Sequence, residues 1–258
     1  MNTKKKILGI GALVLISTAV IALSVNVRSR AMVKKPVAGS VAKAIVYDTV
    51  LLKKFSGLLQ TLDFNRPKFS YAGKFNISDG QDSSANIHDL PFLFCRAGKV
   101  FYSKVGSNEV LNDGRMNIYI ENENKKVVVS SLAYQINPAL SNLSQLISKA
   151  RSEQYELLTS VSGSVEKISL LNEHHVACKE LSVAYDTLSQ KVAQITLRYS
   201  AISDPQNRKK DRKVEIAVGQ TEYDVHMGDY PSVKDIVKEI NGQPVLRSKY
   251  ATFELITL

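Results

Sequence analysis

Alternation of apolar and polar residues with a period of two most restricts how this chain can fold. The pattern is clearest in VAQITLRYSA (192–201), where Ile195, Leu197 and Tyr199 occupy one set of positions and Thr196 and Arg198 the other. The sequence KFSYAGKFNIS (68–78) repeats it. Successive side chains of a strand point to opposite faces, so this alternation predicts strands with one buried face and one face in water.

Shorter segments with strand character follow, separated by turn residues. The separators RAGK, NDGR and ENENKK contain the glycine, asparagine and aspartate residues that hairpin turns require. We expect strands at 68–78, 90–96, 99–105, 115–121, 125–131, 160–172, 175–186, 190–202, 212–221 and 250–258. Consecutive strands joined by short turns form an antiparallel meander.

Three segments have helical character. Apolar spacing predicts a helix over 40–62, ended by NRPK. A second helix is expected over 138–158, capped by Asn137, with Pro138 at its first position. A short one is expected over 231–240, stopped by Asn241 and Gly242. Without repeated βαβ units, a parallel sheet is disfavoured. The predicted class is therefore α+β, a curved antiparallel sheet (an incomplete β-barrel) whose concave side is covered by helices.

The N-terminal part of the chain predicts one transmembrane helix. Residues 7–27 are uncharged, and a helix of that length crosses a bilayer core of about 30 Å. Lysines precede this run and Arg28 and Arg30 follow it. We expect a short cytoplasmic tail (1–6), a signal anchor (7–27), a linker (28–39) and an extracytoplasmic domain (40–258). The alternative is a cleaved signal peptide, with Val20-Ile21-Ala22 as the cleavage site.

The net charge of +10 is concentrated near this segment. The first 35 residues contain seven lysines and arginines and no acid, which leaves 27 basic and 24 acidic residues in the remainder. A nucleic-acid-binding domain concentrates positive charge on its folded body, so the distribution argues against nucleic acid as a partner.

No pattern of catalytic or metal-binding residues stands out. His174 and His175 are adjacent, so in a strand they point to opposite faces and cannot easily share one metal. Nucleophile-elbow, zinc-protease and phosphate-loop motifs are absent from the sequence. We expect no enzyme activity, no cofactor and no metal; a degenerate hydrolase would need a clustered acid–base pair. Cys95 and Cys178 either form a disulfide or remain buried thiols.

A basic patch occupies the sequence NRKKDRK (207–213). It either forms a solvated hairpin tip or binds anionic lipid headgroups or an acidic partner. Its members are Arg208, Lys209, Lys210, Arg212 and Lys213.

Aromatic residues fall largely within the expected strands and have two interpretations. They either fill a core or line the concave face of a curved sheet that accepts an apolar guest. They are Phe69, Tyr71, Phe75, Phe92, Phe94, Phe101, Tyr119, Tyr185 and Tyr199.

The layout resembles the periplasmic lipoprotein-carrier superfamily of the LolA/LolB type. The resemblance rests on a leading amphipathic helix, FSYAGKFNI, a meander, a second helix and paired strands such as VAQITLRYS, and covers about residues 40–258. YAGKFNISDG is also similar to a motif of short anchored proteins of this type in Bacteroidetes. Such carriers shield acyl chains in an incomplete, apolar-lined barrel. The resemblance implies that Phe69, Tyr71, Phe75, Ile77, Ile195, Leu197 and Tyr199 line a ligand site.

These observations predict a binding module held at the inner membrane by a single span, with its C-terminal domain in the periplasm. Its ligand would be apolar or amphiphilic, such as the acyl chain of a lipid or lipoprotein. The alternative is a structural or assembly subunit of an envelope protein complex, with a filled core and no ligand cavity.

Overall fold

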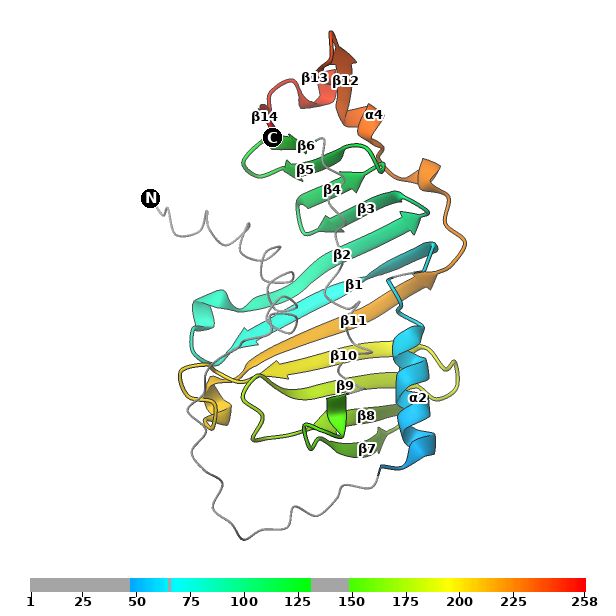
Figure 1. Cartoon of the computed structure of the whole chain (residues 1–258), viewed down its shortest axis with the longest axis vertical. Coiled ribbons are helices and arrows are strands. Elements are labelled where there is room, and N and C mark those ends of the chain that lie inside the picture. The colour runs from blue at the N-terminus through cyan, green and yellow to red at the C-terminus, as the bar shows by residue number, and fades with distance from the viewer. Residues whose placement is uncertain (1–46, 65, 131–148) are drawn as a thin grey trace.

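The computed structural model describes residues 47–64, 66–130 and 149–258 (Figure 1). Its helices are α2 (Thr49–Gln60) and α4 (Val233–Ile236), with 3₁₀ turns at Ser83–Ala85, Arg208–Lys210, Met227–Asp229 and Ser248–Tyr250. Its strands are β1 (Lys68–Asp79), β2 (Ile87–Ala97), β3 (Val100–Val105), β4 (Asn108–Asn112), β5 (Asn117–Glu121), β6 (Lys126–Ser130), β7 (Glu156–Ser162), β8 (Val165–Leu171), β9 (Cys178–Asp186), β10 (Val192–Tyr199), β11 (Arg212–Glu222), β12 (Val237–Ile240), β13 (Gln243–Leu246) and β14 (Glu254–Thr257).

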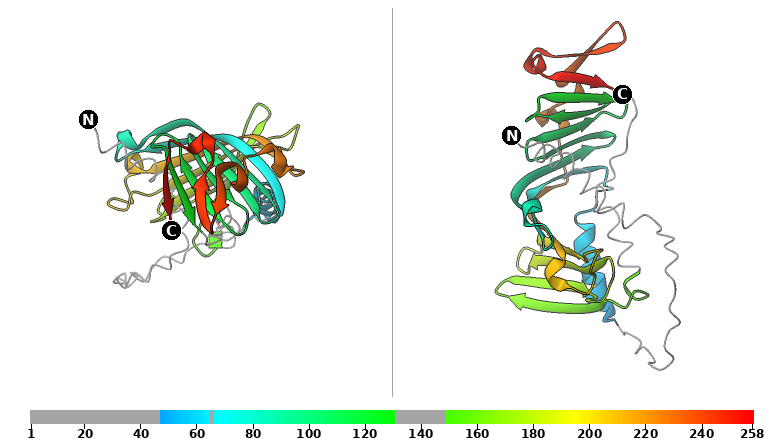
Figure 2. Two further views of the ribbon diagram at one scale, coloured as in Figure 1. Left: turned by 90° about the horizontal axis from the view of Figure 1, so that it is seen from above. Right: turned by 90° about the vertical axis from the view of Figure 1, so that its left-hand side faces the viewer.

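Twelve strands form one long sheet in the order β14-β6-β5-β4-β3-β2-β1-β11-β10-β9-β8-β7 (Figures 1 and 2). Neighbours pair antiparallel except β14, which runs parallel to β6. The end strands β14 and β7 do not pair with each other, so the sheet is open and uncurled. The prediction of a strongly curved sheet closing toward a barrel is therefore wrong, whereas the predominance of antiparallel strands is confirmed.

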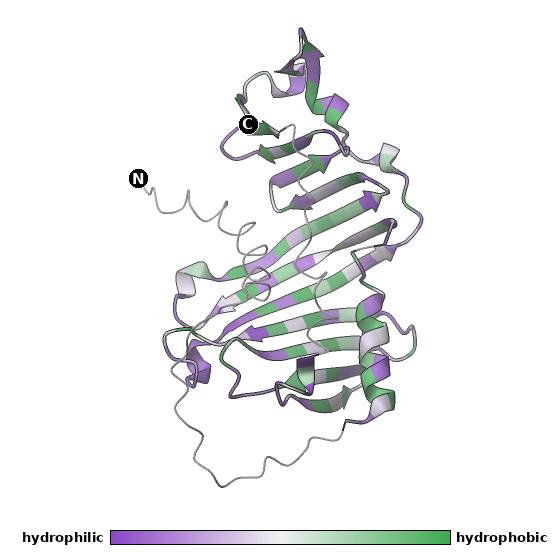
Figure 3. Cartoon of the chain, in the orientation of Figure 1, coloured by the Kyte–Doolittle hydropathy of each residue, from purple (hydrophilic) through white to green (hydrophobic). Residues whose placement is uncertain are grey.

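The described chain contains two hydrophobic cores. The first is built on β1, β2 and β8–β11 and includes Phe69, Tyr71 and Ile195. The second is built on β2–β6 and includes Ile118 and Ile120. Hydrophobic and hydrophilic residues alternate along the strands (Figure 3), and β2 contributes to both cores. The buried face of the sheet therefore changes from one side to the other near β2.

Each core has its own cover. Helix α2 packs over the first core through Phe55, Leu58 and Leu59, and Asp48 caps it by accepting hydrogen bonds from two backbone N–H groups of the first turn. The second core is covered by the C-terminal segment, residues 225–258, through side chains such as Ile236 and Tyr250. The expectation that helices cover one concave side is thus wrong for the second core, whose cover is mostly turns and a short hairpin.

Several expected elements differ from the structure. Of the helix expected over 138–158, residues 138–148 lie outside the described residues, and β7 already begins at Glu156. The expected strand 160–172 is a hairpin turning at Gly163, which has a positive φ of 61°. The helix expected over 231–240 ends at Ile236, and Asn241-Gly242 is the turn between β12 and β13. Asn-Gly is a strong signal for a hairpin turn, and here it connects two strands instead of ending a helix.

The expected tail, signal anchor and linker all lie outside the described residues, as do residues 40–46 of the first expected helix. Within the described ranges, no helix has the length and apolar character needed to span a bilayer. The anchor remains a prediction from the sequence.

Candidate ligand-binding site

A short segment that follows α2, residues 61–64, lies across the first core, and we call it the strap. The helix ends at Gln60, and Leu62 and Phe64 then turn their side chains onto the sheet, where they are 5% and 2% exposed. The Phe64 ring packs edge-on against the rings of Tyr71 and Phe94, with centroids 5.1 Å and 5.7 Å away. The strap therefore forms a roof over aromatic side chains of β1 and β2.

Side chains of β1, of β2 and of Tyr223, which directly follows β11, hold the strap by its backbone. The hydroxyl of Tyr223 donates to the carbonyl oxygen of Thr61 at 2.7 Å, and the hydroxyl of Tyr71 reaches the same oxygen at 3.3 Å. Arg96 donates to the carbonyl oxygen of Phe64 at 2.9 Å. Each such hydrogen bond contributes on the order of 1 kcal/mol, so the strap is fastened by individually modest bonds.

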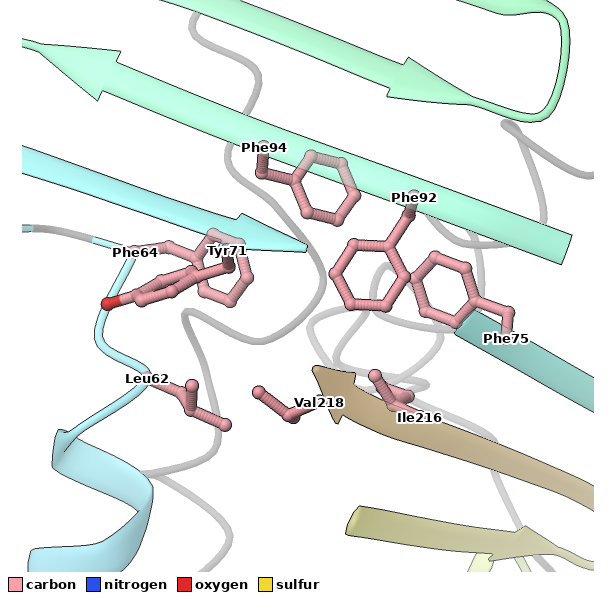
Figure 4. A pocket seen from close by; sticks show the side chains of 8 residues that line it. All are labelled: Leu62, Phe64, Tyr71, Phe75, Phe92, Phe94, Ile216 and Val218. Carbon is pink, nitrogen blue, oxygen red and sulfur yellow. The ribbon is translucent and has the colours of Figure 1, made fainter. Parts of the chain in front are cut away.

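An apolar pocket opens beneath the strap (Figure 4). The space between its side chains is about 280 Å³, including the solvent-filled mouth. Only about 10 Å³ of it can take the centre of a water molecule, enough for roughly one water and far below the roughly 300–1,000 Å³ typical of small-molecule sites, so the lining side chains nearly fill the pocket as observed. It is lined by Leu62, Phe64, Tyr71, Phe75, Phe92, Phe94, Ile216 and Val218.

Glycine at position 73 makes this arrangement of rings possible. A Cβ atom there would lie 2.0 Å from the carbonyl oxygen of Ala217 and 2.8 Å from the Phe92 ring. Without that atom, Phe92 packs close to β1 and meets Phe75 with ring centroids 4.5 Å apart. Glycine within a strand commonly marks such a close approach.

The seven side chains expected to line a site are not all at the pocket. Tyr71 and Phe75 line it, whereas Phe69 is fully buried and stacks on Tyr71 at 4.5 Å. Ile195 and Leu197 are buried in the first core, and Tyr199 packs against it half-buried. Ile77 is also buried, at 5% exposure.

The sequence analysis did not identify several of the residues that line the pocket together with Tyr71 and Phe75. Leu62 was expected to be the last residue of a helix, and Phe64, between that helix and its stop NRPK (65–68), had no predicted role. Ile216 and Val218 belong to the alternation in RKVEIAVGQT, and Phe75 pairs with Ile216 across β1 and β11. Pairing of the two alternating segments would have been the signal, but sequence alone does not supply the register.

The basic patch is divided among several local interactions. Lys210 pairs with Asp204 at 3.0 Å, and Lys213 with Glu215 at 2.8 Å. Arg208 and Lys209 lie exposed in a 3₁₀ turn, and Arg212 is half-buried at the start of β11. Three of the five thus take part in ion pairs, Arg208 with Glu173 at 3.7 Å in addition to the two above, and a binding role for the patch stays a prediction.

A network of charges lies on the sheet face opposite the first core. The carboxylate of Asp211 accepts from Lys179 and Arg198, each at 2.8 Å, and these three side chains are 3%, 1% and 7% exposed. Arg198 also pairs with Glu173 at 2.6 Å and with Glu180 at 3.3 Å. In β10, Arg198 lies between the buried Leu197 and the half-buried Tyr199, which both contact the first core, so alternation places Arg198 on the opposite face.

Acid should weaken this network. Hydrogen bonding to Arg198 lowers the pKa of Glu173 below its ordinary 4.5. Burial opposes ionisation of Glu180, but hydrogen bonds from Lys167 and Ser182 outweigh it and lower that pKa too. Carboxyl groups with depressed pKa values stabilise the fold above the unfolded-state value, and that stability is lost as pH falls.

We therefore expect the free energy of unfolding to decrease as the pH is lowered from about 5 toward 3. The variant Arg198→Gln should show a shallower decrease, because Glu173 loses its main partner. Urea unfolding at a series of pH values measures both slopes. Equal slopes would contradict the role assigned to Arg198.

The two cysteines are free thiols buried in separate cores, Cys178 in the first and Cys95 in the second. Burial raises the pKa of Cys178 to about 12 and also raises that of Cys95. Within the described ranges no three His, Cys, Asp or Glu side chains gather as metal ligands.

Comparison with known proteins gives only distant structural similarity. No family model matches the chain, and no curated protein matches it. A LolA superfamily protein of Nitrosomonas europaea aligns at 7% identity and a TM-score of 0.28, covering 72% of this chain and 97% of that one. A DUF1329 family protein of Desulfovibrio piger aligns at 10% identity and a TM-score of 0.27, covering 68% and 92%. TM-scores this low support no argument about function.

Proposed function

We propose that this chain is a membrane-anchored, extracytoplasmic module that binds an apolar or amphiphilic ligand, such as an acyl chain of a lipid or lipoprotein. The observation that supports it most directly is the apolar pocket beneath the strap. The anchor at 7–27 would keep the module on the inner membrane, with its C-terminal domain in the periplasm.

Binding would be driven by burial of apolar ligand surface. Each buried CH₂ group contributes about 0.8 kcal/mol, so a few methylenes offset the loss of a strap hydrogen bond. The strap is held at its carbonyl oxygens by Tyr223, Tyr71 and Arg96, and also by its buried side chains Leu62 and Phe64. Moving it aside would unpair no strand but would expose those two side chains, so the ligand must replace their apolar contacts. Moving the strap aside would widen the space beneath it, which binding of an acyl chain would require.

Photolabelling of the full-length chain with a diazirine fatty acid tests this function. We expect the label in the peptides that contain the strap and Phe92. Val218→Trp should reduce it about tenfold, because the indole fills the space that one or two methylenes would occupy. Val218→Ala is the matched control, since it enlarges the pocket and should retain labelling.

Circular dichroism checks that both variants fold. If Val218→Trp does not fold, Leu62→Trp places an indole in the same pocket from the side of the strap. Labelling confined to other peptides, or equal in the filled and enlarged pockets, would refute the binding function.

A second candidate, a structural subunit of an envelope complex, is favoured by a different observation. Most of the apolar residues expected to line a cavity are packed inside the first core. Absence of fatty-acid labelling together with recovery of the chain in a defined complex would favour this function.

A further inference from the structure

Strand β7 is a free edge of the twelve-stranded sheet. It pairs with β8 on one side, and no other strand of the described ranges pairs with it on the other. Six of its seven residues are exposed, including Val161 at 69% and Leu158 at 43%. An exposed edge presents unpaired N–H and C=O groups that can bind another strand.

The β7 edge lacks the features that normally prevent strand pairing. Residues 157–162 contain no charge and no proline, and β7 pairs with β8 without a bulge. The opposite edge is different: β14 has only four residues and begins at Glu254, which forms an ion pair with Lys126 at 3.5 Å. Natural sheets usually protect long edges with charges, prolines or bulges, so the unprotected β7 edge suggests a binding surface.

The sequence of β7 is compatible with pairing to itself. Leu157 and Val161 lie two residues on either side of Thr159 and share its face of the sheet. An antiparallel pair centred on Thr159 therefore places Leu157 of each chain opposite Val161 of the other. The single charged residue, Glu156, faces Ser162 of the second chain, so the two carboxylates stay at opposite ends of the pair. A parallel arrangement would instead bring the two Glu156 side chains together.

We propose that β7 pairs antiparallel with β7 of a second copy of this chain, about a twofold axis at Thr159, to form one continuous sheet across two molecules. The symmetric placement of the apolar side chains favours a second copy over an unrelated strand. A seven-residue edge buries less surface than the roughly 1,200 Å² of a stable interface, so the dimer is reversible and concentration-dependent.

Cysteine cross-linking of the full-length chain in mild detergent tests the symmetry axis. Residues directly opposite in an antiparallel pair have Cα atoms about 4.5–5.5 Å apart, within disulfide range. Thr159→Cys should therefore give a disulfide-linked dimer on oxidation, in a yield that rises with protein concentration at a fixed protein-to-micelle ratio. Leu188→Cys, 87% exposed in the β9–β10 turn, is the matched control and should give little dimer. The native Cys95 and Cys178 are at most 1% exposed and should not react.

A second variant tests the interaction without a cross-link. Thr159→Lys places two like charges opposite each other, and the exposed position should leave the fold intact. Sedimentation equilibrium should show self-association weakened at least tenfold, while Leu188→Lys leaves it unchanged. The proposal is overturned if Thr159→Cys cross-links no better than the control, or if Thr159→Lys self-associates like the unmodified chain. Fatty-acid labelling is independent of these outcomes, so the two proposals can fail separately.

Discussion

Replacing Asp211 with alanine is expected to lower the free energy of unfolding by roughly 3–5 kcal/mol, the cost of breaking a buried ion pair from one side. The side chain of Lys179 is 1% exposed and has Asp211 as its ion-pair partner at 2.8 Å, so the substitution leaves a buried ammonium group uncompensated. Arg198 loses one carboxylate but retains Glu173 and Glu180. Urea unfolding followed by far-UV circular dichroism measures the change.

A matched control is available in the same part of the chain. Asp204 pairs with Lys210 at 3.0 Å, but both side chains are at least 40% exposed, so Asp204→Ala should cost no more than about 1 kcal/mol. The double variant Lys179→Met/Asp211→Leu removes both charges and should recover much of the loss. Equal effects of the Asp211 and Asp204 substitutions would show that the buried ion pair contributes no more to stability than the exposed one.

Replacing Phe55 with alanine should also cost about 3–5 kcal/mol, through lost burial and the cavity left behind. Phe55 is fully buried and docks α2 onto the first core. The strap begins where α2 ends, so this variant should also weaken fatty-acid labelling at the strap. Thermal unfolding and the photolabelling assay measure the two effects on one sample.

The exposed residue Gln60, in the last turn of the same helix, provides the comparison. Gln60→Ala should change stability by less than about 0.5 kcal/mol and leave labelling unchanged. A Phe55→Ala variant as stable as Gln60→Ala would mean that α2 is not held by its apolar face.

The alternation of apolar and polar residues predicted strands reliably where every second residue is polar. It placed β1 and β10 correctly to within a few residues, because Lys74 or Arg198 identifies the opposite face. It missed β4, where the neighbours Val110 and Leu111 point to opposite faces and both are buried. In β2 the residues on both faces of the strand are apolar. The pattern therefore could not reveal that each face packs against a different covering segment.

The pocket was less predictable than the strands. Tyr71 and Phe75 belong to an alternating segment, but the strap is positioned by hydrogen bonds from residues far away in sequence, such as Tyr223 to Thr61. Those contacts depend on tertiary register, which propensity and periodicity do not encode. The same limit applies to the Asp211 network, which joins the start of β11 to β9 and β10.

The switch of buried face at β2 makes that strand the least tolerant place in the chain for an insertion or deletion. Phe92 and Phe94 face α2 and the strap, whereas Leu93 and Cys95 face the C-terminal layer. Shifting this strand by one residue would exchange the two sets. Both cores would then receive side chains of the wrong volume, so a single inserted or deleted residue in β2 would damage two hydrophobic cores at once.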